Sequence, residues 1–250
     1  MIALQPYVAP VLTVAAVQYN ALDGGVAANA VEHVRCIEDA DSHGASLVLF
    51  PELSLTGYDL RLLEGPGEWL SAEDARLTDL HEICRRTGIT AVVGAPWRDP
   101  QGNPRLASLA VHPDGHVTPV YKTHLHGQEK ELFVAGDGPA LLKLHGWKIA
   151  FAICSDAAHP AHAVEAARLG ADVYAVSALY VEGQEQRLEL HLAGRSMDHA
   201  MYSILANLAG DTTLGRSCGL SGIWDPNGRR IARVGGTGRG MVVAELSVRN

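Results

Sequence analysis

Three segments of this sequence place an ionisable or nucleophilic side chain directly after an apolar run. Glu52 follows "SLVLFP", Lys122 follows "HVTPVY" and Cys154 follows "KIAFAI". Apolar runs of this kind are typical of buried strands, and ligand sites in α/β proteins gather at the carboxyl ends of strands. We therefore predict that the three side chains converge in one pocket.

This set of side chains is suited to nucleophilic catalysis by a thiol. A cysteine becomes nucleophilic near neutral pH only when a base or a positive environment helps it to lose its proton. Lys122 can supply the positive charge, and Glu52 can accept the proton. A helix that begins after Cys154 adds free backbone N–H groups, which favour a thiolate or an oxyanion.

The elements that must position these residues alternate between strands and helices. Strands are predicted at 11–19, 45–52, 89–96, 171–179, 202–210 and 240–248, strand pairs at 106–121, 141–154 and 221–235, and helices at 26–43, 71–87, Cys154 to Arg168 and about 185–200. No linker, repeat or low-complexity segment interrupts this order. The pattern predicts one α/β domain over residues 1–250, with 1–10 as a short N-terminal extension.

The composition of the sequence bears on which partners the protein can bind and where in the cell it is expected. Lys and Arg number 20 against 28 Asp and Glu, a formal net charge of −8, so no basic footprint for nucleic acid is present. No run approaches the roughly 18 apolar residues of a membrane span, and the N-terminal apolar stretch lacks the basic start of a signal peptide. Four widely spaced cysteines without a CxxC pair favour a reduced, cytoplasmic location. Of these, Cys36 and Cys84 are predicted to be small core residues.

The segments around the three residues resemble motifs of a known family. Glu52 in "FPELSLTGYDL", Lys122 in "YKTHLHGQEKELFVAG" and Cys154 in "ICSD" resemble the Glu-Lys-Cys triad of the carbon–nitrogen hydrolase (nitrilase) superfamily. The resemblance continues through "ARLGADVYAVSAL", "GRSMDHAMYSILANLAG" and "GLSGIWDPNGRRIA", and so covers nearly the whole chain. Three motifs in the family's order over this length make the resemblance specific.

The resemblance implies a fold and a mechanism. The fold is a four-layer α-β-β-α sandwich that pairs through its α faces, so a homodimer or higher homo-oligomer is expected. Cys154 would attack the carbon of a small amide to give a thioester and release ammonia or an amine. Glu52 would be the general base, and Lys122 with the backbone N–H after Cys154 would hold the oxyanion. We expect no metal or cofactor.

The resemblance also assigns supporting residues. Glu129 matches the family's second glutamate, four residues before Phe133, and would position the substrate and support the lysine. Tyr58 matches the aromatic residue that follows the triad glutamate, and either shapes the pocket or is a packed tyrosine.

Several positions depart from the family pattern and predict a distinct substrate pocket. Ser155 stands where an aromatic residue often follows the cysteine, Ala161 replaces a glutamate, and Ala135 replaces a proline. The stretch from Ser177 to Tyr180 occupies the place of a frequent pocket tryptophan, so both of these residues are candidate pocket residues. These departures bear on which substrate is bound and leave the predicted reaction of the three catalytic residues unchanged.

Several alternative functions share the triad or the fold. N-carbamoyl-amide hydrolases and nitrilases use the same three residues; an amidase is favoured because nitrilases are usually longer at the C-terminus. Among amidases, ω-amidase-like action on a dicarboxylic monoamide is one option. "PELSLTGY" also resembles the glutaminase domains of glutamine-dependent NAD synthetases, although no synthetase domain follows here. A non-catalytic binding module on the same fold is the alternative from another class.

Two other hydrolase classes find less support in the sequence. His124 with His126, and His159 with His162, are closely spaced, but no HExxH motif accompanies them, which disfavours a metallohydrolase. Ser221 in "GLSGI" lacks the spacing of a nucleophile elbow, which disfavours a serine hydrolase. For assembly, apolar helix faces in 71–87 and 160–169 are expected to leave patches that a second subunit covers.

Overall fold

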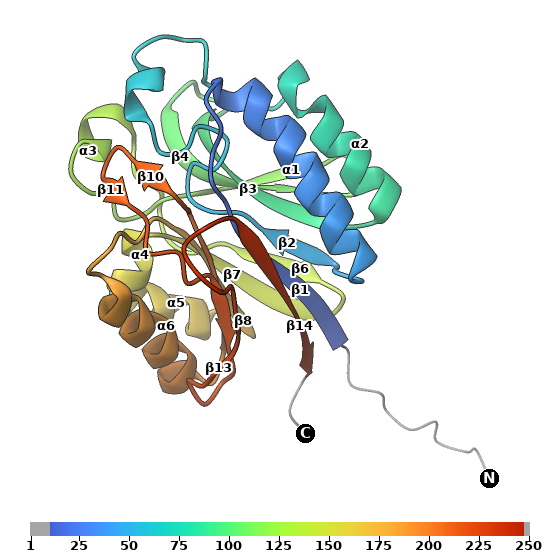
Figure 1. The fold of residues 1–250 in the computed structure, drawn as a ribbon, viewed down its shortest axis with the longest axis vertical. Helices are drawn as coiled ribbons and strands as arrows, with labels where there is room; N and C mark the ends of the chain where they lie inside the picture. Colours follow the sequence, from blue (N-terminus) through green and yellow to red (C-terminus); the bar gives the residue numbers. More distant parts are fainter. Residues whose placement is uncertain (1–10, 248–250) are drawn as a thin grey trace.

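Two six-stranded sheets form the centre of the molecule (Figure 1). The computed structural model describes residues 11–247, so the predicted extension 1–10 and the last residue of the strand expected at 240–248 lie outside it. The first sheet has the order β14 (Gly240–Ser247), β1 (Val11–Gln18), β2 (Leu47–Leu49), β3 (Thr90–Arg98), β4 (Pro104–Val111) and β5 (Val117–Tyr121). The second has the order β13 (Arg230–Arg233), β12 (Gly222–Trp224), β9 (Tyr202–Asn207), β8 (Val173–Ala178), β7 (Trp147–Ile153) and β6 (Leu141–Leu144).

Each sheet has a parallel centre and antiparallel edges. Strands β1, β2 and β3 are parallel to one another, as are β7, β8 and β9. Hairpin partners β4, β5 and β6 and the C-terminal β12, β13 and β14 complete the sheets in antiparallel register. The carboxyl ends of the parallel strands can therefore present side chains at one edge, where α/β proteins bind ligands.

Alternation along the central strands creates separate apolar layers. Leu47 and Leu49 of β2 belong to the same buried cluster as Ile149 and Phe151 of β7, which lies between the two sheets. Val48, between the two leucines, instead packs in the cluster beneath the helices of the first sheet. Because successive side chains on a strand point to opposite faces, each central strand contributes to two layers.

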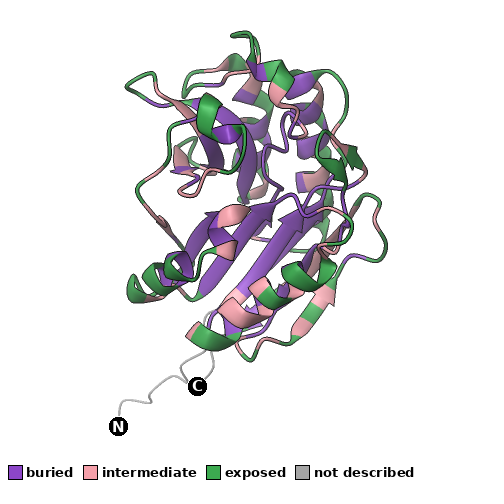
Figure 2. Cartoon of the chain, turned by 90° about the vertical axis from the view of Figure 1, so that its left-hand side faces the viewer, coloured by how far each residue is buried: buried purple, intermediate pink, exposed green. Residues whose placement is uncertain are grey.

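Helices cover the outer face of each sheet. Helices α1 (Gly25–Ser42) and α2 (Thr78–Thr87) lie over the first sheet, and α4 (Ser155–Ala158), α5 (Pro160–Arg168) and α6 (Glu185–His199) lie over the second (Figure 1). Figure 2 shows the central strands buried between helices whose outward faces are exposed. The predicted four-layer α-β-β-α sandwich in a single domain is therefore confirmed. Within residues 11–247, the helices are too short or too polar to cross a lipid bilayer.

Three predicted elements have different limits in the structure. The helix expected from 71 begins at Thr78, after a 3-10 turn at Ala75–Leu77. The helix expected from Cys154 to Arg168 is broken at His159, which is extended because Pro160 disfavours helical geometry in the preceding residue. The strand expected at 45–52 pairs only over Leu47–Leu49, since the chain turns away after it to carry Glu52.

The sequence predicts apolar patches on the helix faces in 71–87 and 160–169, and the structure has large exposed apolar side chains only on the second of these faces. Leu80, Ile83 and Cys84 of α2 are buried within the chain itself, so this face leaves no patch. On the other outer layer, Val164 and Leu169 remain exposed. Of the two cysteines predicted to be core residues, Cys84 is fully buried as predicted, whereas Cys36 is only partly buried. Association into a dimer stays a prediction.

A glycine on β3 allows the loop that carries Glu52 to lie directly on the sheet. A Cβ atom built on Gly94 would lie 2.2 Å from the carbonyl oxygen of Pro51 and 2.4 Å from the backbone nitrogen of Leu53. The backbone N–H of Gly94 also donates to the hydroxyl of Ser54 at 3.1 Å. Because the clashing atoms are backbone, no rotamer change can make room for a side chain.

We predict that Gly94→Ala destabilises the fold and displaces Glu52. Overpacking of this kind costs about 1–3 kcal/mol, so thermal unfolding should shift to lower temperature. The control is Gly194→Ala in α6, where nothing lies within 4 Å of the added Cβ. Alanine is the better helix former, so the control should be neutral or slightly stabilising. A Gly94→Ala protein as stable as the control would contradict this close packing.

Candidate active site

Cys154 occupies a strained turn between β7 and α4. Its backbone has φ 49° and ψ −102°, a conformation that non-glycine residues rarely adopt. The turn is held from β8 and the segment after it: the Cys154 N–H donates to the carbonyl of Ser177 at 2.8 Å, and its thiol lies 3.8 Å from the carbonyl oxygen of Leu179. Strained residues held by their surroundings cluster at functional sites.

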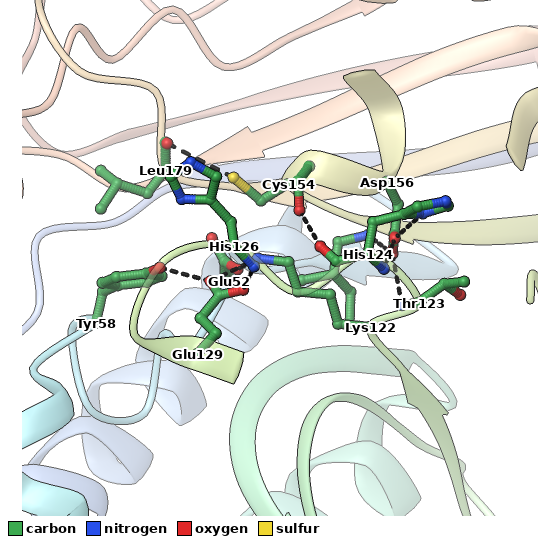
Figure 3. Close-up of polar contacts among 12 residues, drawn as sticks. Glu52, Tyr58, Lys122, Thr123, His124, His126, Glu129, Cys154, Asp156 and Leu179 are labelled. Atoms are coloured by element: carbon green, nitrogen blue, oxygen red, sulfur yellow. Dashed lines mark hydrogen bonds and ion pairs between the residues drawn. The ribbon is translucent and has the colours of Figure 1, made fainter. Parts of the chain in front are cut away.

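A buried ammonium group lies between two carboxylates next to this cysteine (Figure 3). Lys122 Nζ donates to Glu52 Oε1 and to Glu129 Oε1, each at 2.6 Å. All three side chains are at most 1% exposed. Charges buried this deeply need partners of opposite sign, so each member of the cluster holds the others in place.

The two glutamates have different surroundings. The Tyr58 hydroxyl donates to Glu129 Oε1 at 2.5 Å, and the backbone N–H of His126 donates to Glu129 Oε2 at 2.8 Å. Both oxygens of Glu129 are thus engaged. Oε2 of Glu52 is buried and has no hydrogen-bond partner among the described residues. Glu52 therefore has an oxygen available to accept a proton, whereas both oxygens of Glu129 are held by hydrogen bonds.

Burial controls the ionisation of the three reacting groups. It raises the pKa of Glu52 to about 7, although the Lys122 charge opposes the shift. It also raises the pKa of the Cys154 thiol to about 12, and the Glu52 charge adds to that rise. Burial alone would lower the pKa of Lys122, but the neighbouring acidic groups raise it overall. Near neutral pH, Cys154 is therefore a thiol and Lys122 a cation, and Glu52 is divided between its carboxylate and carboxylic acid forms.

Asp156 ties the cysteine turn to the segment that carries Lys122. Its Oδ2 accepts from the backbone N–H groups of Ile153 at 3.0 Å and Thr123 at 3.3 Å. Its Oδ1 accepts from the backbone N–H of His124 at 2.7 Å and from that residue's ring Nδ1 at 2.9 Å. One buried carboxylate thus joins the first sheet to the second behind the reacting groups.

Of the four closely spaced histidines, His124, His159 and His162 surround Asp156, whereas His126 is exposed and lines the cavity. His124 and His159 stack with centroids 3.9 Å apart, and Nδ1 of His162 lies 2.9 Å from the hydroxyl of Tyr174. Over residues 11–247, no three His, Cys, Asp or Glu side chains are grouped as a metal site requires. The buried Ser221 hydroxyl accepts from the backbone N–H of Asn207 and donates to its carbonyl, so it is not available as a nucleophile.

A cavity of about 250 Å³ opens in front of the thiol. Its walls come from both sheets, from α6 and from the loop between β10 (Asp211–Thr212) and β11 (Gly215–Arg216). The lining residues are Glu52, Tyr58, Lys122, His126, Glu129, Cys154, Ser155, Ala158, Leu179, Tyr180, Val181, Gln184, Arg187 and Leu214. A cavity of this size suits a small molecule.

Most of the side chains singled out from the sequence meet at this cavity. The triad, Glu129, Tyr58, Ser155 and Tyr180 all line it. Ser177 is not among the lining residues: its hydroxyl donates to the carbonyl of Phe50 at 2.7 Å and links the two sheets. Ser155 also has a structural contact, since its hydroxyl donates to the carbonyl of His124.

Sequence reasoning did not identify several residues of the site. Asp156 lies two positions after the cysteine, where a buried acidic residue could have been suspected from the "ICSD" motif. Gln184 and Arg187 are three positions apart at the start of a helix, a spacing that places side chains on one face. Leu214 reaches the cavity only because its loop docks on the Tyr58 segment, through Thr213 Oγ1 donating to the carbonyl of Tyr58 at 3.0 Å.

Comparison with known proteins agrees with this geometry. The sequence model of the carbon-nitrogen hydrolase family matches residues 13–250. A nitrilase of Pyrococcus abyssi is 30% identical over 218 residues, which cover 86% of this chain and 81% of that protein. The 2-oxoglutaramate amidase of Bacillus subtilis is 27% identical over 241 residues, covering 94% of this chain and 91% of that protein.

Solved structures give the same result for the fold. An amidase of the nitrilase superfamily from Nesterenkonia sp. AN1, in complex with butyramide, matches with a TM-score of 0.84 and 26% identity, over 94% of this chain and 91% of that chain. Another structure of that amidase shows acrylamide added to its active-site cysteine. The chain belongs to the carbon–nitrogen hydrolase family, with the fold of the nitrilase superfamily.

The unequal surroundings of the two glutamates predict unequal effects of substitution. Glu52→Gln keeps the shape but removes the proton acceptor, so kcat should fall about 10²–10⁴-fold. Glu129→Gln loses one hydrogen bond, because its amide NH₂ would face the His126 N–H, and kcat should fall about tenfold. Steady-state ammonia release from both proteins, with melting curves to confirm folding, checks this. Equal losses would show that the roles are divided wrongly, and a larger loss for Glu129→Gln would exchange them.

Proposed function

We propose that the protein hydrolyses a small linear amide through a thioester on Cys154. One observation carries the proposal: a protonated thiol lies beside a carboxylate that has an unpaired buried oxygen and a pKa of about 7. Glu52 is thus ionised in a large fraction of molecules at neutral pH and can take the thiol proton as sulfur attacks.

The first half-reaction forms the thioester. Sulfur bonds to the amide carbon while the thiol proton passes to Glu52 Oε2. The carbonyl oxygen becomes an oxyanion, which Lys122 Nζ and the backbone N–H of Ser155 stabilise. Glu52 then gives the proton to the amide nitrogen, the C–N bond breaks, and ammonia or an amine leaves.

The second half-reaction releases the acid. Water takes the place of the departed amine, and Glu52 accepts one of its protons as the water oxygen bonds to the acyl carbon. The same two donors stabilise the second oxyanion. The C–S bond then breaks, and the proton returns from Glu52 to the sulfur, which restores the thiol.

Glu129 and Tyr58 support both steps without exchanging protons with the substrate. Glu129 keeps the Lys122 ammonium aimed at the cavity, and its own position is set by the Tyr58 hydroxyl and the His126 N–H. Burial raises the pKa of Tyr58, with the neighbouring glutamates adding to the rise, so the hydroxyl stays a donor. Such a preorganised donor needs no rearrangement when charge develops.

Amide hydrolysis is favoured over the other reactions that the triad supports. The similarity to an amidase structure extends over 94% of this chain, and a relative covering a similar share is named a 2-oxoglutaramate amidase. N-carbamoyl amides and nitriles can also react with a thiol activated in this way, and one relative is named a nitrilase. Substrate comparison distinguishes these classes.

We predict that ammonia release from a panel of small amides depends on Cys154. The panel includes short linear amides, N-carbamoyl compounds and nitriles, and the amides should have the highest kcat/KM. Cys154→Ala should fold normally but retain less than about a hundredth of the wild-type rate, since no other nucleophile replaces the thiol. Cys84→Ala, which removes a buried thiol remote from the cavity, is the matched control. Turnover by Cys154→Ala above that level would contradict the mechanism.

A further inference from the structure

The cavity has ends of different exposure and charge. Glu52, Lys122 and Glu129 form its buried end, whereas Arg187 and Leu214 are exposed at its outer end. The buried end holds two carboxylates around one ammonium, so it repels a further anion when both glutamates are ionised. The outer end has a guanidinium and no acidic side chain among its lining residues.

Two residues at the outer end, Gln184 and Arg187, have hydrogen-bond donors without acceptors among the described residues. Gln184 Oε1 accepts from the backbone N–H of Val181 at 3.2 Å, which leaves the amide NH₂ of Gln184 without an acceptor among residues 11–247. Arg187 has neither an ion pair nor a hydrogen bond within the same part of the chain. Arg168 and Arg216, by contrast, lie within ion-pair distance of Glu165 and Glu182.

Tyr180, which also lines the cavity, already has a hydrogen-bond partner for its hydroxyl. The Tyr180 hydroxyl shares a hydrogen bond with Nδ1 of His191 at 3.0 Å. Burial, followed by the charge of Arg187, lowers the pKa of His191 to about 4, so the ring is neutral. The permanent positive charge at this end of the cavity is therefore the guanidinium of Arg187.

We propose that Arg187 and Gln184 bind a carboxylate of the substrate. The substrates are then short linear monoamides that carry a carboxylate at the end remote from the amide. Guanidinium and amide N–H groups match the planar, two-oxygen geometry of a carboxylate. The charges also orient the molecule, since the carboxylate is repelled from the glutamates and attracted to Arg187, which directs the amide to Cys154. This inference rests on the proposed hydrolysis.

The first experiment compares a charged substrate with a neutral one of the same shape. Succinamate carries the carboxylate, and levulinamide has a methyl ketone in its place. The wild-type protein should have the higher kcat/KM for succinamate. Arg187→Gln should lower the ratio of the two kcat/KM values about 10–100-fold, mainly through KM, as expected for loss of a charge-assisted hydrogen bond. Arg187→Lys should recover part of it.

A matched control and a binding measurement make the result decisive. Arg233→Gln removes an exposed arginine of β13 outside the cavity and should leave the ratio unchanged. Calorimetric binding of succinamate to Cys154→Ala, with and without Arg187→Gln, tests the carboxylate site without any turnover. Binding that depends on Arg187 in a protein that hydrolyses no amide would overturn the proposed function and support this site. A ratio and an affinity that are both insensitive to Arg187→Gln would overturn the site itself.

Discussion

The buried ion cluster of Lys122 with Glu52 and Glu129 is the interaction on which the site depends. An ammonium group in an apolar interior is strongly unfavourable unless it is paired and hydrogen-bonded. Here it donates to both carboxylates at 2.6 Å. Burial raises the pKa of Glu52 to about 7; the Lys122 charge opposes this rise, and the Glu129 charge offsets part of the Lys122 effect. Burial of the paired cluster thus gives Glu52 a pKa suited to a base near neutral pH.

Both sheets are needed to bring this cluster next to Cys154. Glu52 follows β2 and Lys122 follows β5 in the first sheet, while Cys154 follows β7 in the second. The cavity forms where these strand ends face each other across the sandwich. Asp156 joins the two sides through backbone hydrogen bonds to Ile153 and Thr123. Small shifts between the sheets would change the distance from thiol to base, and this carboxylate restrains them.

Particular residues show what the sequence could and could not predict. Apolar runs ending at Glu52, Lys122 and Cys154 predicted a shared site because buried parallel strands end at one edge of a sheet. The break at His159 could have been read from Pro160, but the shortness of β2 depends on how Gly94 accepts the following loop. Ser177 was expected in the pocket, yet residues on a strand alternate between faces and its hydroxyl bonds to Phe50. Leu214 reaches the cavity only because its loop packs on the distant Tyr58 segment, and the sequence around Leu214 has no pattern that predicts this contact.

The central claim is that the free oxygen of Glu52 removes the proton of Cys154. The most direct measurement is the rate of Cys154 alkylation by iodoacetamide as a function of pH, followed by mass spectrometry of the intact protein and of the Cys154 peptide. The ionised carboxylate is the active form, so the rate should rise with pH through about 7, where Glu52 titrates, and fall away below it. In Glu52→Gln this rise should vanish, leaving only slow labelling that increases toward the high pKa of the thiol. An unchanged rise near pH 7 in Glu52→Gln would contradict the account.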